Sequence, residues 1–155
     1  MSKTNAVRIL EARGVRHSTI SYEVHEDELD ALSVADKIGA GHEEVFKTLV
    51  ARGDKTGINV FCIPASAELD LKKAALVSEN KKVEMIKVKE LLPLTGYIRG
   101  GCSPLGMKKS YPTYIDETAQ LFDEIYVSAG VRGMQLKISP RDLAETTGGA
   151  FADIT

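Results

Sequence analysis

The side chains best suited to chemistry lie in one glycine-rich stretch, residues 95–109, with the sequence TGYIRGGCSPLGMKK. Three of its side chains could take part in a reaction: Tyr97, Cys102 and Ser103. Glycine permits positive φ angles and lets a ligand approach the main chain, so successive N–H groups can line a site for an anion or an oxyanion. The stretch is therefore either a backbone-lined binding loop or a tight connection between two strands, with Pro104 at its corner.

A lysine in an apolar run is the second candidate. In VFKTLVARGD, residues 45–54, the residues up to Ala51 are apolar except Lys47 and Thr48. On a strand, Lys47 shares a face with Leu49 and Ala51, whereas Thr48 points the other way. Because a buried ammonium needs a partner, Lys47 either reaches solvent at the sheet edge or meets an anionic or carbonyl-bearing ligand, such as an ester.

Short strands and helices that interleave irregularly must position these residues. Alternation predicts a strand over residues 17–25, hairpins over residues 45–63 and 124–138, and short strands at KKVEMI, PTYID and FADI. Helices are expected near the N-terminus up to Gly14, from Ser33, over residues 66–78, over residues 87–96 with a break at Pro93, and from an N-cap at Ser139. This order favours an α+β, or complex α/β, fold with a mixed, barrel-like β-sheet flanked by short helices, in a single domain over residues 1–155.

Composition limits the classes of function. The formal net charge is −2 and 43% of the 155 residues are hydrophobic, which excludes a general nucleic-acid coat and suits one ordinary core. Cys62 and Cys102 are expected as reduced thiols, the three histidines lack metal-ligand spacing, and no metal site is predicted. No apolar run approaches the roughly 20 residues that span a bilayer, so a cytoplasmic location is expected. The sequence also lacks GxSxG and any Ser/His/Asp set, so no protein nucleophile is predicted.

Five motifs in order carry a family resemblance: VFKTLV, ELDLKK, KKVEM, TGYIRGGCSPLGMKK and IYVSAGVRG. Over most of residues 4–154 the chain resembles the YbaK/EbsC family of free-standing aminoacyl-tRNA deacylases, which are related to the editing domain of some prolyl-tRNA synthetases. The resemblance implies hydrolysis of mischarged Cys-tRNA(Pro), with the substrate's own thiol attacking its ester. It also implies tRNA as a partner, prolyl-tRNA synthetase as a further candidate partner, and no cofactor.

The resemblance also implies roles for particular residues. Lys47 would hold the terminal adenosine and the ester, and Gly100 with Gly101 would present N–H groups near the carbonyl. The substrate-binding candidates are Tyr22, Thr48, Ser103, Ser128 and Gln135. Gln135 falls where family members can carry an aspartate, so two alternatives stay open: a deacylase for another mischarged tRNA, such as Ala-tRNA(Pro), or a non-catalytic module that binds tRNA or a synthetase. A third alternative is a protein that binds a small nucleotide.

Overall fold

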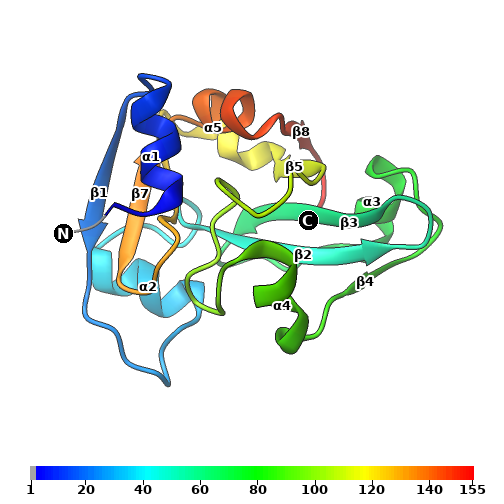
Figure 1. Ribbon diagram of the computed structural model, residues 1–155, viewed down its shortest axis with the longest axis horizontal. Coiled ribbons are helices and arrows are strands. Elements are labelled where there is room, and N and C mark those ends of the chain that lie inside the picture. The colour runs from blue at the N-terminus through cyan, green and yellow to red at the C-terminus, as the bar shows by residue number, and fades with distance from the viewer. Residues whose placement is uncertain (1–2) are drawn as a thin grey trace.

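The strands divide between two sheets (Figure 1). The computed structural model describes residues 3–155 and confirms the α+β class. Within these residues, one sheet has the order β4-β2-β3-β5-β8 and the other the order β1-β7-β6. The first sheet is mixed, because β3 pairs with β5 and β5 with β8 in parallel, whereas β2 pairs with β3 and β4 in antiparallel. The strands are β1 (His17–Ser21), β2 (Phe46–Gly53), β3 (Gly57–Pro64), β4 (Val83–Met85), β5 (Thr113–Asp116), β6 (Ile125–Ser128), β7 (Met134–Ile138) and β8 (Ala150–Ala152).

The helices are short, and side chains cap most of their N-termini. They are α1 (Asn5–Ala12), α2 (Ala31–Ile38), α3 (Leu71–Val77), α4 (Val88–Thr95), the 3-10 helix η1 (Glu117–Leu121) and α5 (Pro140–Thr147). The predicted N-cap of the last helix is confirmed, since the Ser139 side chain accepts a hydrogen bond from the Asp142 N–H. None of the helices in residues 3–155 is long and apolar enough to cross a membrane.

The two sheets meet at the start of β2. The Tyr126 N–H of β6 donates to the Glu44 carbonyl at 2.9 Å, and Val45 forms an isolated parallel bridge with Tyr126. Both predicted hairpins, β2 with β3 and β6 with β7, are confirmed. The mixed sheet is therefore built as predicted, but the strands form two joined sheets rather than one closed barrel. The junction places Lys47 beside the end of β6.

Several predicted boundaries differ from the structure. The helix expected over residues 66–78 begins only at Leu71, because Asp70 is its N-cap and accepts from the Lys72 and Lys73 N–H groups. The helix expected from Ser33 begins earlier because Asp30 is its N-cap and accepts from the Ser33 N–H at 3.1 Å. Pro93 lies inside α4 without breaking it, because α4 ends soon afterwards, at Gly96 with a φ of 85°. The first strand ends at Ser21 rather than residue 25, since its partner β7 begins at Met134.

Candidate functional site

A cavity of about 370 Å³ opens where the two sheets meet. Its walls come from α2 and the segment before it, from the first half of β2, from the glycine-rich loop and from the ends of β6 and β7. Five of the predicted site residues line it: Lys47, Thr48, Gly100, Ser128 and Gln135. Segments that are far apart in the sequence thus form one site.

Lys47 enters this cavity half-buried from β2. Its Nζ donates to the Ala65 carbonyl at 3.3 Å, which uses one of the three ammonium N–H groups. Burial lowers the pKa of Lys47, and the negative charges of Glu68 and Asp30 partly oppose this shift. The remaining donors can meet a carbonyl oxygen in surroundings where a charge is screened less than in water.

Two buried polar atoms at this site have no hydrogen-bond partner among residues 3–155: Thr48 Oγ1 and Gln135 Oε1. Thr48 lies directly across from Cys62 in the β2–β3 ladder, and its hydroxyl lies near the Cys62 thiol, which forms only weak hydrogen bonds. Gln135 is 5% exposed and lies directly across from Ser128 in the β6–β7 ladder. Leaving such a group unsatisfied costs about 1–3 kcal/mol, so both atoms are suited to a ligand that supplies donors.

The glycine-rich loop is held against the 130–133 turn. The Arg132 Nε donates to the Arg99 carbonyl at 2.8 Å. A Cβ added at Gly101 would lie 3.0 Å from the backbone nitrogen of Arg132, so only glycine fits there without displacement. Gly100 has a φ of 84° and lines the cavity.

The prediction that Gly101 presents a free N–H group is corrected by the loop geometry. Its N–H donates to the Ile98 carbonyl at 2.9 Å, which closes a turn. Gly100 makes no such backbone bond within residues 3–155. In this conformation the loop therefore offers the Gly100 N–H, while Gly101 provides the close packing.

Two other predicted contacts, Tyr22 and Ser103, do not line the cavity. The Tyr22 ring lies 6.0 Å from the Lys37 ammonium, just beyond the end of β1. Ser103 is fully buried, and its hydroxyl accepts from the Leu105 N–H at 3.3 Å, so it supports the loop from within. The sequence analysis missed Leu29 and Asp30, which do line the cavity. The capping pattern at Asp30 predicts only where α2 begins, and no local signal in the sequence shows that this segment packs at the site.

Burial disfavours the reactive thiolate form of the cysteine at the site. Cys102 lines the cavity, is 9% exposed, and burial raises the pKa of its thiol to about 12. A thiol in that state stays protonated at neutral pH, and it is the thiolate that attacks. Among residues 3–155, no group of three or more His, Cys, Asp or Glu side chains could hold a metal ion.

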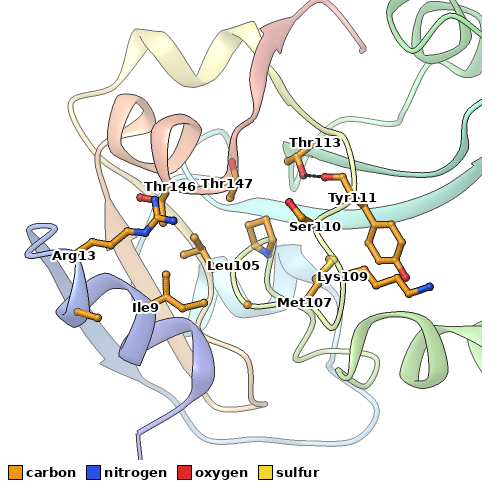
Figure 2. A pocket seen from close by; sticks show the side chains of 13 residues that line it. Ile9, Arg13, Leu105, Met107, Lys109, Ser110, Tyr111, Thr113, Thr146 and Thr147 are labelled. Atoms are coloured by element: carbon orange, nitrogen blue, oxygen red, sulfur yellow. Dashed lines mark hydrogen bonds between the residues drawn. The ribbon is translucent and has the colours of Figure 1, made fainter.

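A second cavity, of about 320 Å³, lies on the other side of the glycine-rich loop (Figure 2). Four of its hydroxyl groups already donate to backbone carbonyls: Tyr111 to Leu94, Thr113 to Tyr111, Thr146 to Asp142 and Thr147 to Leu143. Figure 2 shows its two cationic side chains at opposite sides of the cavity: Arg13 extends towards Thr146, and the Lys109 ammonium points away. None of the predicted site residues lines this cavity.

The fold and the cavity define a class of protein. The chain belongs to the aminoacyl-tRNA editing domain family, whose model matches residues 25–146. It is similar to a protein of Enterococcus faecalis named as a Cys-tRNA(Pro)/Cys-tRNA(Cys) deacylase, EbsC, with 52% identity over 99% of this chain and 93% of the relative.

Solved structures share the fold over nearly the whole chain. A crystal structure described as a trans-editing enzyme for prolyl-tRNA synthetase has a TM-score of 0.86 and 26% identity, over 100% of this chain and 99% of that one. The crystal structure of hypothetical protein APE2540 has a TM-score of 0.88 and 23% identity, over 97% of this chain and 99% of that one.

Proposed function

We propose that this protein is a free-standing deacylase that hydrolyses the ester of Cys-tRNA(Pro). Membership of the editing-domain family and 52% identity to the E. faecalis relative support this reaction. The observation that carries the proposal is the cavity itself. It combines the half-buried ammonium of Lys47 with two unpartnered polar atoms and contains no activated protein nucleophile.

The need for such a reaction follows from the energetics of discrimination. Cysteine and proline are similar in size, and a missing methylene is worth only about 1–3 kcal/mol in an apolar pocket. A synthetase specific for proline therefore attaches cysteine at times. A second site must inspect the charged tRNA, and a chemical difference is a better criterion there than size.

The thiol of the substrate is that chemical difference. Its sulfur attacks the ester carbonyl carbon, a carbon–sulfur bond forms, and the carbon–oxygen bond to the ribose breaks. The proton lost by the thiol ends on the ribose hydroxyl that leaves. The products are uncharged tRNA and a cyclic thioester of cysteine, which water then hydrolyses to free cysteine. Prolyl-tRNA has no thiol and is spared.

The cavity residues orient the ester and stabilise the charge that develops on it. The Lys47 ammonium and the Gly100 N–H donate to the carbonyl oxygen as it becomes an oxyanion. Gln135 Oε1 accepts from the α-amino group of the substrate, which satisfies an atom that is otherwise buried without a partner. Thr48 Oγ1 receives a further donor from the ribose. Ser128, whose hydroxyl accepts from the Gly130 N–H, closes the end of the cavity beside Gln135.

The partners follow from this reaction. The tRNA is the substrate, and prolyl-tRNA synthetase is the proposed source of the mischarged molecule. Because the net charge of this chain is −2, the chain can neutralise few tRNA phosphates and should bind tRNA weakly. A complex with the synthetase would supply additional contacts to the tRNA.

The test is a comparison of deacylation rates for Cys-tRNA(Pro), Cys-tRNA(Cys), Ala-tRNA(Pro) and Pro-tRNA(Pro). Both cysteinyl substrates should lose their amino acid, and prolyl-tRNA should not. S-methylcysteinyl-tRNA(Pro) is the matched control, because it keeps the side-chain sulfur but blocks the thiol with one methyl group, and it should resist hydrolysis. Release of alanine would identify a water-dependent reaction and overturn the thiol route. Absence of all hydrolysis would favour a binding module.

A further inference from the structure

Asp30 is the one carboxylate, among residues 3–155, that lines the cavity where the two sheets meet. It is the N-cap residue of α2 and is exposed, so its side chain lies at the rim of the cavity. The other charged side chains of the lining are the cations Lys47 and Arg99. A ligand that brings a positive charge into this cavity therefore has a single carboxylate to pair with.

The Asp30 carboxylate has room for a further hydrogen-bond donor. Its Oδ1 accepts from the Ser33 hydroxyl at 2.7 Å and its Oδ2 from the Ser33 N–H at 3.1 Å, which uses two of its roughly four lone-pair positions. The bond from the Ser33 hydroxyl lowers the pKa of Asp30, so the group is negatively charged at neutral pH. None of the ion pairs in the described part of the chain, residues 3–155, includes Asp30.

The fold holds this carboxylate close to the groups proposed to bind the ester. The preceding residue, Leu29, packs against the glycine-rich loop, since a Cβ added at Gly100 would lie 3.4 Å from the Leu29 Cβ. Burial lowers the pKa of Lys47, and the negative charges of Glu68 and Asp30 oppose that shift. Of these two acids only Asp30 lines the cavity, because Glu68 lines a separate one.

The substrate of the proposed reaction carries a second positive charge. Its α-ammonium group is bonded to the carbon next to the ester carbonyl, so it comes within a few ångströms of the Lys47 ammonium when Lys47 donates to that carbonyl. Two such charges repel about four times more strongly near a protein surface than in bulk water. A carboxylate beside both charges offsets this repulsion. The buried, unpartnered Gln135 Oε1 offers a second acceptor in the same cavity.

We propose that Asp30, together with Gln135, recognises the free α-ammonium group of the substrate and thereby excludes tRNAs whose α-nitrogen is acylated. The proposal names the substrate class of the proposed function and rests on it. A peptidyl-tRNA that ends in cysteine carries the same thiol and the same ester, so attack by the thiol would cleave it as well. Its α-nitrogen is an uncharged amide with one N–H, which leaves the Asp30 carboxylate without a cation. Asp30 therefore confines the reaction to aminoacyl-tRNA.

The first test measures binding without turnover. The ligands are the non-hydrolysable cysteinyl amide of 3′-amino-3′-deoxyadenosine and its 3-mercaptopropionyl counterpart, which lacks only the α-amino group. At about pH 6, where an α-amino group is charged, the cysteinyl ligand should bind about fivefold more tightly in an NMR titration, the upper range for an ion pair that solvent reaches. Asp30→Asn should remove most of this preference. Asparagine also caps helices well, so α2 should keep its start.

The second test compares deacylation of Cys-tRNA(Pro) and N-acetylcysteinyl-tRNA(Pro). The natural protein should prefer the free amine, and Asp30→Asn should raise KM for Cys-tRNA(Pro) about fivefold with little effect on the acetylated substrate. Asp36→Asn is the matched control, because it removes the same charge from an exposed position of α2 outside the cavity. The control should change neither substrate.

Three results would overturn the proposal: equal affinity for the two analogues or no binding of either, equal rates on the two tRNAs in the natural protein, or an equal loss on both tRNAs in Asp30→Asn. The last result would mean that Asp30 acts through Lys47 or through the fold. Deacylation of Cys-tRNA(Pro) with equal binding of the analogues would leave the deacylase standing without this recognition. Preferential binding of the amine, lost in Asp30→Asn, without any deacylation would uphold the recognition and refute the reaction.

Discussion

Replacing Lys47 with methionine tests the central residue of the proposed site. Methionine keeps a long flexible side chain but removes the ammonium, which donates to the Ala65 carbonyl. Lys47 also lines the cavity of about 370 Å³ where the two sheets meet, which we call the acyl cavity because it is the proposed site of the aminoacyl ester. A hydrogen bond from a charged group is worth about 1.5–3 kcal/mol, and each 1.36 kcal/mol is a factor of ten in rate. We therefore expect kcat/KM for Cys-tRNA(Pro) to fall about 10- to 150-fold.

The same substitution should leave the fold almost intact. The Ala65 carbonyl loses a donor, but the protein no longer holds a half-buried charge. These effects oppose each other, so the free energy of unfolding should change by less than about 1 kcal/mol. Urea denaturation measures this change in the free energy of unfolding, and it separates a loss of activity from a loss of structure.

The lowered pKa of Lys47 makes the stability of the folded state depend on pH. Burial lowers its pKa below the ordinary 10.5, so the folded state releases the proton at a lower pH than the unfolded state. The cost of holding the charge is fully present below the folded-state pKa, and it disappears as pH rises through that value towards 10.5. The stability contributed by this group therefore increases with pH in that window, and Lys47→Met should lose this increase.

The affinity for a substrate analogue should fall, rather than rise, with increasing pH. Only the charged form of Lys47 donates strongly to the ester, so the affinity for a non-hydrolysable amide analogue of cysteinyl-adenosine should fall as pH rises through the lowered pKa. Lys47→Met should show weak, pH-independent binding in the same range.

The assay follows release of labelled cysteine from Cys-tRNA(Pro) at several substrate concentrations. Lys72→Met is the matched control, since Lys72 is exposed on α3 and its side chain lies outside the acyl cavity. The control should keep the full rate. A folded Lys47→Met protein with an unchanged rate would refute the catalytic role. The only role left for Lys47 would then be its hydrogen bond to the Ala65 carbonyl.

Three further substitutions give distinct outcomes. Gly101→Ala should lower both the unfolding midpoint in urea and the deacylation rate, because its Cβ would lie 3.0 Å from the Arg132 nitrogen; an unaffected protein would mean that the 130–133 turn yields easily. Cys102→Ala should retain deacylation within a few-fold, since burial raises the pKa of that thiol to about 12, and a complete loss of rate would identify Cys102 as a nucleophile. Asp116→Ala should reduce the free energy of unfolding by about 2–3 kcal/mol, because the buried Asp116 carboxylate accepts from Thr118 and from the Ile154 N–H, while the rate per folded molecule stays the same.

Local signals explain which elements were predicted correctly. The β2–β3 hairpin follows from two apolar runs joined by a short polar turn, and the Ser139 cap of α5 follows from a serine, a proline and an aspartate in the first turn. The start of α2 was misplaced because both Asp30 and Ser33 are good capping residues, and only the folded chain shows that Asp30 accepts the bond. The junction between the two sheets depends on the contact between Glu44 and Tyr126, for which the sequence contains no local signal.

The sequence by itself determined the strand that carries Lys47, the glycine-rich loop and the family to which both belong, because apolar periodicity and glycine spacing are local properties. The tertiary structure decided which of these groups face the acyl cavity. Gly101 loses its N–H to the Ile98 carbonyl and Ser103 is buried beneath the loop, whereas Gln135 arrives from a strand far along the chain with its amide oxygen unpartnered. The physical reason is that the freedom of a hydrogen-bonding group depends on every neighbour around it, and most of these neighbours come from distant segments that only folding brings together.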